Sequence, residues 1–295
     1  MGKKITIFGN GEIGSAIGKI LAGKGFEVYF WDREPGKVTP NMTLEQMAKA
    51  SDFVFLCVPS WVLRDALEQI KAFLKSGTVL ISLAKGMENT GKTVDEIIRE
   101  TVPNNFVLMS GPMLAEEISQ GALGFAVLAS QAGVDTVKAK ELFIGTNVHT
   151  EISEDVRTVA FAGVLKNVYA LVIGIVSGLG YGDNLKGYLV SKIWAEWEYL
   201  TELLGLNRAV LASTAGVGDF IATSFSGYSK NHELGEKLAK GDVTGLMSEG
   251  LSSLPGLVGA VSSKTETLPR YLLNLKKIVI DKESAKEVFK LSPQE

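Results

Sequence analysis

Three glycines near the start of the chain are spaced so that their backbone could approach a phosphate group. Gly9, Gly11 and Gly14 follow the apolar run Ile5–Phe8 and open a stretch with helical spacing. The first glycine permits a tight turn, the second admits a pyrophosphate against the backbone, and the third lets the helix pack on the sheet. N–H groups at the helix start would face the phosphates. The predicted dinucleotide-binding loop comprises Gly9, Asn10, Gly11, Glu12, Ile13 and Gly14.

An acidic residue follows the second predicted strand, where a nucleotide site needs one. Asp32 lies 23 positions after Gly9, and it would accept hydrogen bonds from an adenosine ribose and repel a 2′-phosphate. Arg33 would pair with that phosphate or stack on adenine, unless it is a solvated surface charge. Asp32 therefore favours NAD, and Arg33 leaves NADP as the alternative. The competing interpretation of the loop is a glycine turn with no ligand.

Three lysines lie where an ammonium group could transfer a proton or bind an anion. Lys85 follows the fourth apolar run, at the carboxyl end of a predicted strand, where open α/β sheets bind ligands. Lys166 interrupts an apolar helical stretch, so it either extends to solvent or has a function. Lys230 precedes Asn231 and a helical stretch, where phosphate binding is physically easy. Lysine is the obvious proton donor, because burial can bring its pKa towards neutrality.

Other candidates for catalysis are scarce. The chain has two histidines, His149 and His232, and one cysteine, Cys57. We expect His149 to be structural or solvated, and Cys57, inside the apolar run Phe53–Val58, to be a buried thiol. These residues cannot form an intramolecular disulfide or a Cys/His zinc cluster, so we predict no metal site.

Short apolar runs alternate with helical patterns over the first 150 residues. The runs are continuous rather than alternating in polarity, which is typical of parallel strands buried on both faces. The predicted fold class is therefore α/β, with an N-terminal Rossmann-type, doubly wound, mostly parallel sheet. The runs are Ile5–Phe8, Val28–Trp31, Phe53–Val58, Val79–Leu83, Phe106–Met109, Phe125–Leu128 and a weaker one near Val148.

After residue 150 the strand signals fade and the helical stretches lengthen. Asp183 and Asn184 predict a helix N-cap, and Gly205 predicts the end of that helix. We expect a dinucleotide-binding domain over 1–150 and an all-helical C-terminal domain over 151–295, with the boundary in Thr146–Asp155. The predicted apolar stripe of the helix is Leu185, Tyr188, Leu189, Ile193, Trp194, Trp197 and Leu200.

The bulk composition excludes several classes of protein. A chain of 295 residues exceeds what one hydrophobic core usually serves, so two domains are expected. A net charge of −3 offers no basic footprint for a nucleic acid. The run Val168–Val176 is too short to span a bilayer, which needs about 20 residues. We therefore expect a cytoplasmic protein with no nucleic-acid partner and no membrane span.

Taken together, these segments resemble the NAD(P)-dependent glycerol-3-phosphate dehydrogenases over nearly the whole chain. The resemblance implies a Rossmann domain followed by a helical domain, with the active site between them. It implies interconversion of dihydroxyacetone phosphate and sn-glycerol 3-phosphate, and a homodimer is common in this family. The segments that carry it are 9–14, 57–60, 83–86, 110–112, 165–168, 178–184, 216–219 and 229–231.

The resemblance also implies roles for individual side chains. Lys166 would be the catalytic general acid/base, and Lys85 would stabilise the developing negative charge on the substrate oxygen. Asp219 would orient Lys166, and Asn167 and Thr223 would help to set that network.

Binding roles carry over in the same way. Lys230 and Asn231 would hold the substrate phosphate. Glu249 would lie near the nicotinamide half of the cofactor, and Ala115 would contact the cofactor through its backbone. Further implied cofactor contacts are Pro59, Lys85 and Lys230. The implied substrate contacts are Lys85, Gly111, Met113, Lys166, Asp219, Ser229, Lys230 and Asn231.

Some positions depart from the family pattern. Lys230 replaces an arginine and so loses the bidentate fork, and His232 replaces a second arginine. Met113 replaces a Ser or Thr and cannot donate a hydroxyl hydrogen bond, and the segment Pro35–Ser51 is shorter than typical. These changes bear on substrate affinity and identity, while the catalytic pair is intact.

Two alternatives therefore remain. One is a related Rossmann reductase or dehydrogenase of another small hydroxy or keto compound, such as ketopantoate or a β-hydroxy acid. Such enzymes lack the Gly-Asp-Asn and Gly-Val-Gly-Asp segments found here at 182–184 and 216–219. The other is a nucleotide-binding protein without turnover, against which the retention of Lys85, Lys166 and Asp219 argues.

Overall fold

The computed structural model describes residues 2–131, 133–242 and 247–290. The chain forms two compact units, Met1–Lys85 with Val94–Ala160, and Gly86–Thr93 with Phe161–Glu295. We call these unit 1 and unit 2, and we describe each by itself. The expected division at residue 150 differs from these bounds, because the last strand of the sheet runs past it and a short segment after Lys85 packs with the helical unit.

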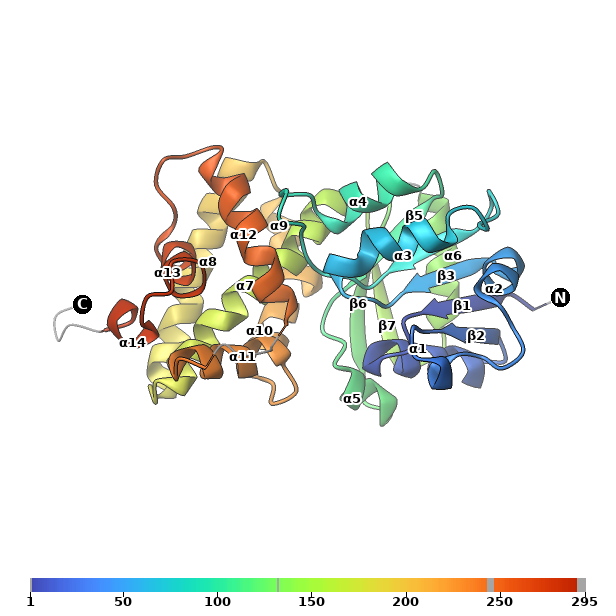
Figure 1. Ribbon diagram of the computed structural model, residues 1–295, viewed down its shortest axis with the longest axis horizontal. Helices are drawn as coiled ribbons and strands as arrows, with labels where there is room; N and C mark the ends of the chain where they lie inside the picture. Colours follow the sequence, from blue (N-terminus) through green and yellow to red (C-terminus); the bar gives the residue numbers. More distant parts are fainter. Residues whose placement is uncertain (1, 132, 243–246, 291–295) are drawn as a thin grey trace. The chain divides into compact units, whose positions relative to one another are not determined.

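Unit 1 contains a seven-stranded sheet in the order β2-β1-β3-β4-β5-β6-β7 (Figure 1). Adjacent strands pair in parallel except β5 and β6, which are antiparallel. This confirms the predicted doubly wound, mostly parallel sheet, and each predicted apolar run overlaps a strand. The strands are β1 (Lys4–Phe8), β2 (Glu27–Trp31), β3 (Phe53–Leu56), β4 (Val79–Ser82), β5 (Phe106–Ser110), β6 (Gly124–Ala129) and β7 (Val148–Ser153).

Helices cover the sheet because its strands are apolar on both faces. One face packs Ile7, Phe55 and Ile81 against Ile17 of α1 and Leu142 of α6. The chain turns from β1 to β2 in one direction and from β3 to β5 in the other, so right-handed crossovers place α3 and α4 opposite α1. The helices are α1 (Glu12–Gly23), α2 (Leu44–Ala50), α3 (Leu63–Ile70), α4 (Val94–Thr101), α5 (Ala115–Ser119) and α6 (Gly133–Phe143), with short 3-10 turns η1 (Pro35–Lys37) and η2 (Ser60–Val62).

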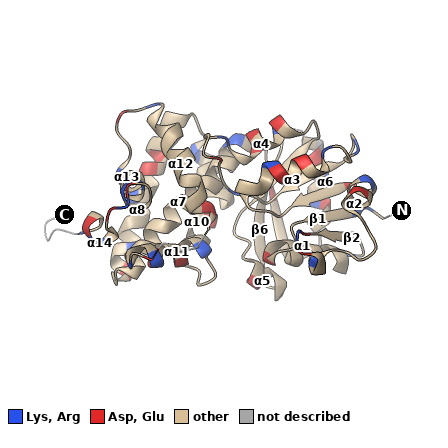
Figure 2. Cartoon of the chain, viewed as in Figure 1, with Lys and Arg blue, Asp and Glu red and all other residues tan. Residues whose placement is uncertain are grey.

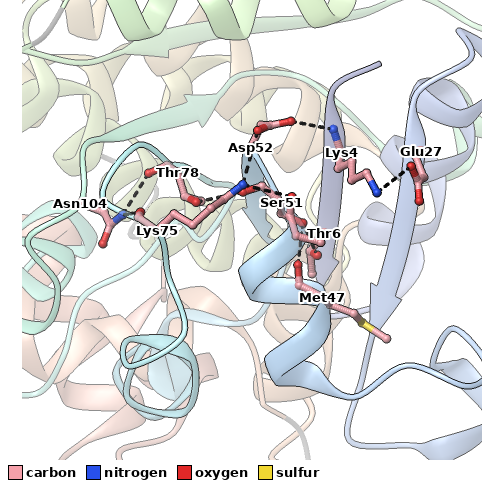
Figure 3. Close-up of polar contacts among 10 residues, drawn as sticks. Lys4, Thr6, Glu27, Met47, Ser51, Asp52, Lys75, Thr78 and Asn104 are labelled. Carbon is pink, nitrogen blue, oxygen red and sulfur yellow. Dashed lines mark hydrogen bonds and ion pairs between the residues drawn. The ribbon is translucent and has the colours of Figure 1, made fainter. Parts of the chain in front are cut away.

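Buried hydroxyl groups tie the amino ends of the strands together (Figure 3). The hydroxyls of Thr6 and Ser51 are 2.7 Å apart, and the Ser51 hydroxyl also donates to the Met47 carbonyl at 2.9 Å. Thr78 Oγ1 donates to the Ser51 carbonyl at 2.9 Å, and Asn104 Nδ2 donates to the Thr78 carbonyl at 3.1 Å. Side chains thus link β1, β3 and β4 at an edge where each of these three buried hydroxyls has a partner.

Unit 2 is helical, apart from a hairpin at Gly86–Thr93 that is closed by the bridge between Met87 and Thr93. From Val156 onward, every element of the described residues is helical, which confirms the predicted helical C-terminal domain. The elements are α7 (Val156–Gly178), α8 (Asp183–Leu204), α9 (Arg208–Leu211), the π-helical turn η3 (Thr214–Gly218), α10 (Asp219–Phe225), α11 (Lys230–Ala239), α12 (Glu249–Ser262), α13 (Arg270–Val279) and α14 (Ala285–Val288).

The core helix of unit 2 is α7. It is long and apolar enough to cross a membrane, but its apolar window is entirely buried within the protein. Packing inside the protein therefore explains why α7 is so apolar. A Cβ on Gly174 of α7 would lie 2.2 Å from the His232 carbonyl oxygen, and one on Gly235 of α11 would lie 2.5 Å from the Leu171 carbonyl oxygen. These glycines let the backbones of α7 and α11 touch.

The predicted helix over 183–204 is present, with two differences. Its N-cap is Gly182, and Asp183 is instead the first helical residue, paired with Lys186 at 3.0 Å. Tyr188 of the predicted stripe is 46% exposed, because the stripe is wider than the face that packs. Gly205 ends the helix in a left-handed conformation with φ of 64°, as predicted.

Candidate active site

The glycine loop of unit 1 adopts the conformation that its sequence predicts. Gly9 has φ of +100°, and a Cβ there would lie 2.7 Å from the Cys57 carbonyl oxygen. A Cβ on Gly14 would lie 2.0 Å from the Gly9 carbonyl oxygen. Both positions therefore require glycine, the first for its dihedral angle and the second for the close packing of α1 on the loop.

Gly11 differs from these two glycines, because a Cβ there would meet no protein atom within 4 Å. Gly11 is the N-cap of α1 and provides no side-chain cap for the start of the helix. Glu12 begins α1 at the surface, and the half-buried Ile13 packs against the core. This space at the start of a helix fits a dinucleotide pyrophosphate.

Asp32 is held in place at the end of β2. Its carboxylate accepts hydrogen bonds from the backbone N–H groups of Asn10, at 2.8 Å, and Glu34, at 3.0 Å. The Asn10 side chain donates to the Lys37 carbonyl at 2.8 Å. A cavity of about 370 Å³ opens beside Asp32, which suits the adenosine half of a dinucleotide. Its lining residues are Trp31, Asp32, Arg33, Pro35, Val38, Thr39, Pro40, Asn41 and Met42.

A second set of polar groups lies where β4 and β5 end. Lys85 Nζ donates to the Gly111 carbonyl oxygen at 2.9 Å. Gly111 has φ of +150°, and a Cβ there would lie 2.4 Å from the Phe125 carbonyl oxygen, so glycine is required. The hydroxyls of Ser82 and Ser110 are buried and have no hydrogen-bond partner among the described residues. These serines were not predicted as site residues, because their only signal in the sequence is a hydroxyl at the last position of an apolar strand.

Three further predicted ligand contacts of unit 1 have varied surroundings. Met113 packs against the core of the sheet, so its thioether contributes packing where a hydroxyl was expected to bind. Ala115 is the first residue of α5, and Pro59 is exposed after β3. Their roles toward a cofactor stay predictions.

The two histidines and the cysteine lie in different environments. Burial raises the pKa of the Cys57 thiol to about 12, so it is protonated at neutral pH, in agreement with a structural thiol. His149 of β7 stacks on Phe125, with ring centroids 5.5 Å apart. His232 Nε2 lies 3.5 Å from a Glu236 carboxylate oxygen. No cluster of three metal-ligating residues occurs among the described residues.

A buried charged cluster forms the centre of the site in unit 2. Lys166 is 7% exposed and Asp219 is 3% exposed. Lys166 Nζ donates to Thr223 Oγ1 at 2.9 Å and lies 3.4 Å from Asp219 Oδ1. The Thr223 hydroxyl in turn lies 3.4 Å from the same carboxylate oxygen. The structure thus joins three residues that the family resemblance linked, and it shows that Lys166 does not extend to solvent.

The sequence places these groups through two different elements. Lys166 lies on α7, which Figure 2 shows as almost uncharged and whose only other charged residue is Arg157. Asp219 begins α10 directly after η3, where a Cβ on Gly216 would lie 2.0 Å from the Leu211 carbonyl oxygen. This close turn sets the start of α10 at Asp219.

Two asparagines beside the cluster join three helices. Asn231 Nδ2 donates to Asn167 Oδ1 at 2.8 Å, and Asn231 Oδ1 accepts from the Gly250 N–H at 2.9 Å. A Cβ on Gly250 would lie 2.2 Å from the Asn167 carbonyl oxygen. Asn231, which was predicted to bind the substrate phosphate, therefore also holds α7, α11 and α12 together.

The remaining predicted residues of unit 2 lie at helix starts. Lys230 is the exposed first residue of α11, and Ser229 is its N-cap, whose hydroxyl accepts from the His232 N–H at 3.2 Å. Glu249 is the first residue of α12 and is half-buried. The first N–H groups of α12 are already bonded within the protein, since Gly250 donates to Asn231 and Leu251 donates to Ser248.

Comparison with known proteins agrees with this geometry. Models of the N-terminal and C-terminal parts of NAD-dependent glycerol-3-phosphate dehydrogenase match residues 34–134 and 155–288. The glycerol-3-phosphate dehydrogenase [NAD(P)+] of Clostridium tetani is 32% identical, over 85% of this chain and 81% of that protein. The chain belongs to the NAD(P)-dependent glycerol-3-phosphate dehydrogenase family.

Other relatives agree with this membership. The enzyme of the same name from Moorella thermoacetica is 31% identical, over 85% of this chain and 84% of that protein. The crystal structure of glycerol-3-phosphate dehydrogenase from Coxiella burnetii covers 97% of both chains with a TM-score of 0.88 and 22% identity, which supports the fold. Membership confirms the predicted family and its nicotinamide cofactor, and it does not favour the alternative of a reductase for another hydroxy or keto compound.

Proposed function

We propose that this chain interconverts dihydroxyacetone phosphate and sn-glycerol 3-phosphate, with Lys166 as the general acid/base. The observation that carries the proposal is the buried ammonium of Lys166, 2.9 Å from Thr223 Oγ1 and 3.4 Å from Asp219 Oδ1. A buried charge is costly unless it is paired and hydrogen-bonded. Thr223 and Asp219 provide this pairing for the Lys166 ammonium on an otherwise apolar helix. A lysine exposed to solvent would not need such partners.

In the reducing direction, Lys166 Nζ gives a proton to the oxygen on C2 of the substrate. The new O–H bond forms as the N–H bond breaks, and Lys166 is left as a neutral amine. Asp219 pairs with the ammonium before transfer, and Thr223 orients it. The Lys85 ammonium stabilises the negative charge that develops on the same oxygen. In the oxidising direction, Lys166 takes the proton back.

The nicotinamide ring, when bound, supplies the hydride in the reducing direction and accepts it in the other. The glycine loop would hold the pyrophosphate, and Asp32 and Arg33 would hold the adenosine half. Pro59, Ala115 and Glu249 are proposed as further contacts. Asp32 favours NAD, because a carboxylate repels a 2′-phosphate.

The substrate phosphate is assigned to Lys230 and Asn231 at the start of α11, with Ser229 as a further contact. A helix start favours an anion, and a lysine adds a point charge. A homodimer and a cytoplasmic location stay predictions of the family resemblance.

One assay tests the proposal. Purified protein is mixed with dihydroxyacetone phosphate and either NADH or NADPH, and the absorbance of the reduced cofactor is followed. We expect turnover in the ordinary enzymatic range, about 1–10³ s⁻¹. Dihydroxyacetone without the phosphate is the matched control and should be turned over far more slowly. Absence of oxidation with either cofactor, or faster turnover of ketopantoate, would overturn the assignment.

A further inference from the structure

The segment after Lys85 connects this lysine to the helical unit. Lys85 ends the first segment of unit 1, and the hairpin Gly86–Thr93 belongs to unit 2. Within unit 1, the Lys85 ammonium is bonded to the Gly111 carbonyl at 2.9 Å. Because a peptide bond joins Lys85 to Gly86, whatever fixes the hairpin also constrains the backbone of Lys85.

Helix α12 fixes the hairpin at two points. The Met87 N–H donates to Ser253 Oγ at 3.0 Å, and both residues are at most 1% exposed. A Cβ on Gly256 would lie 2.2 Å from the Glu88 carbonyl oxygen. The backbone of the hairpin therefore rests on α12 at a position that admits only a hydrogen atom.

The same helix contacts the neighbour of Lys166 at its other end. Gly250, in the first turn of α12, donates its N–H to Asn231, and a Cβ there would lie 2.2 Å from the Asn167 carbonyl oxygen. Helices rise about 1.5 Å per residue, so Gly250 and Gly256 lie about 9 Å apart along the axis of α12. One helix thus holds both the segment next to Lys166 and the segment next to Lys85.

We propose that α12 and the hairpin 86–93 position Lys85 for the reaction, with Ser253 and Gly256 as positioning residues that touch neither substrate nor cofactor. This inference rests on the proposed role of Lys85 as the group that stabilises the developing charge. Since a displacement of about 1 Å can cost about 100-fold in rate, loosening the contact of α12 with the hairpin should lower kcat.

A matched pair of glycines on α12 tests this. Gly256→Ala places a methyl group against the Glu88 carbonyl, whereas a Cβ on Gly259 would meet no atom within 4 Å. We expect Gly256→Ala to lower kcat about 10- to 100-fold, with NADH binding unchanged and with kcat of Gly259→Ala close to that of the original enzyme. Ser253→Ala, which removes one hydroxyl, is the second variant if Gly256→Ala does not fold, and it should lower kcat less.

The same substitutions are then made in a Lys85→Ala enzyme. If α12 acts through Lys85, Gly256→Ala and Ser253→Ala cause no further loss there, because the two effects are not additive. An equal loss in both backgrounds would show a merely structural effect and overturn the inference, as would equal kcat for Gly256→Ala and Gly259→Ala. A Lys85→Ala enzyme with normal kcat would instead contradict the proposed role of Lys85 itself.

Discussion

The sheet of unit 1 has an amino edge, formed by the amino ends of its strands, and a carboxyl edge, formed by their carboxyl ends. The two differ in whether their buried hydroxyl groups are hydrogen-bonded. At the amino edge, Thr6, Ser51 and Thr78 are all hydrogen-bonded to protein partners (Figure 3). At the carboxyl edge, the hydroxyls of Ser82 and Ser110 have no hydrogen-bond partner within the described part of the chain. A buried polar group without a partner lowers the free energy of unfolding by about 1–3 kcal/mol. The edge with the predicted ligand site therefore contributes less to stability.

The glycines extend this comparison within the carboxyl edge. Gly9 and Gly14 are fixed by contacts with the protein, whereas Gly11 faces open space. The fold alone requires glycine at positions 9 and 14, whereas it does not require glycine at position 11, where we expect the pyrophosphate. The comparison thus separates residues that build the site from residues that leave room for a ligand.

The largest effect is expected from breaking the loop itself. Gly14→Ala places a Cβ 2.0 Å from the Gly9 carbonyl oxygen and should cost at least about 3 kcal/mol of unfolding free energy. Gly11→Ala should leave stability within about 0.5 kcal/mol yet weaken NADH binding at least about tenfold, or about 1.4 kcal/mol. Urea unfolding and NADH titration measure the two effects. Normal NADH affinity in Gly11→Ala would show that the open space is not the pyrophosphate site.

At the amino edge, a smaller effect on stability alone is expected. Ser51→Ala removes the hydroxyl that bonds to Thr6 and to the Met47 carbonyl and leaves the Thr6 hydroxyl buried without that partner. The free energy of unfolding should fall by about 1–3 kcal/mol, with kcat unchanged. Ser119→Ala, at an exposed serine of α5, is the control and should stay within about 0.5 kcal/mol. A drop in kcat for Ser51→Ala would remove the contrast between the edges.

The smallest effect is expected at the carboxyl edge. Ser82→Ala and Ser110→Ala each remove a hydroxyl without a protein partner, so the free energy of unfolding should stay the same or rise by up to about 1 kcal/mol. Denaturant unfolding of both variants beside Ser51→Ala gives the comparison directly. If either variant loses as much stability as Ser51→Ala, its hydroxyl is satisfied in solution, as by an ordered water.

Much of the fold could be predicted from the sequence, because it depends on local patterns. Continuous apolar runs mark β1 to β7, and the spacing of Gly9, Gly11 and Gly14 marks the turn into α1. The end of α8 at Gly205 followed from glycine's tolerance of a left-handed backbone. The N-cap predicted at Asp183 or Asn184 lies earlier, at Gly182, so that Asp183 is the first helical residue.

The rest depends on contacts between distant segments. The approach of Lys166 to Asp219 joins residues 53 positions apart, and it was expected only through the family resemblance. The hairpin after Lys85 carries no sequence signal for packing with the helices, since Gly256 reveals its role only when the Glu88 carbonyl is seen beside it. Met113 was predicted to contact the substrate because it follows the segment 110–112, and its side chain packs against the core of the sheet.

The central claim is that proton transfer depends on the buried ammonium of Lys166. The most direct measurement is kcat for dihydroxyacetone phosphate reduction by Lys166→Ala, with NADH affinity and the unfolding midpoint measured on the same sample. Lys192→Ala, which removes a lysine from the surface of α8, is the control. The Lys166→Met, Asp219→Asn double variant leaves no unpaired buried charge and must be as inactive.

The account predicts that kcat of Lys166→Ala falls about 10²- to 10⁴-fold, that NADH binds normally, and that Lys192→Ala is fully active. A folded Lys166→Ala enzyme with kcat within about twofold of the original, a change of about 0.4 kcal/mol, would contradict it.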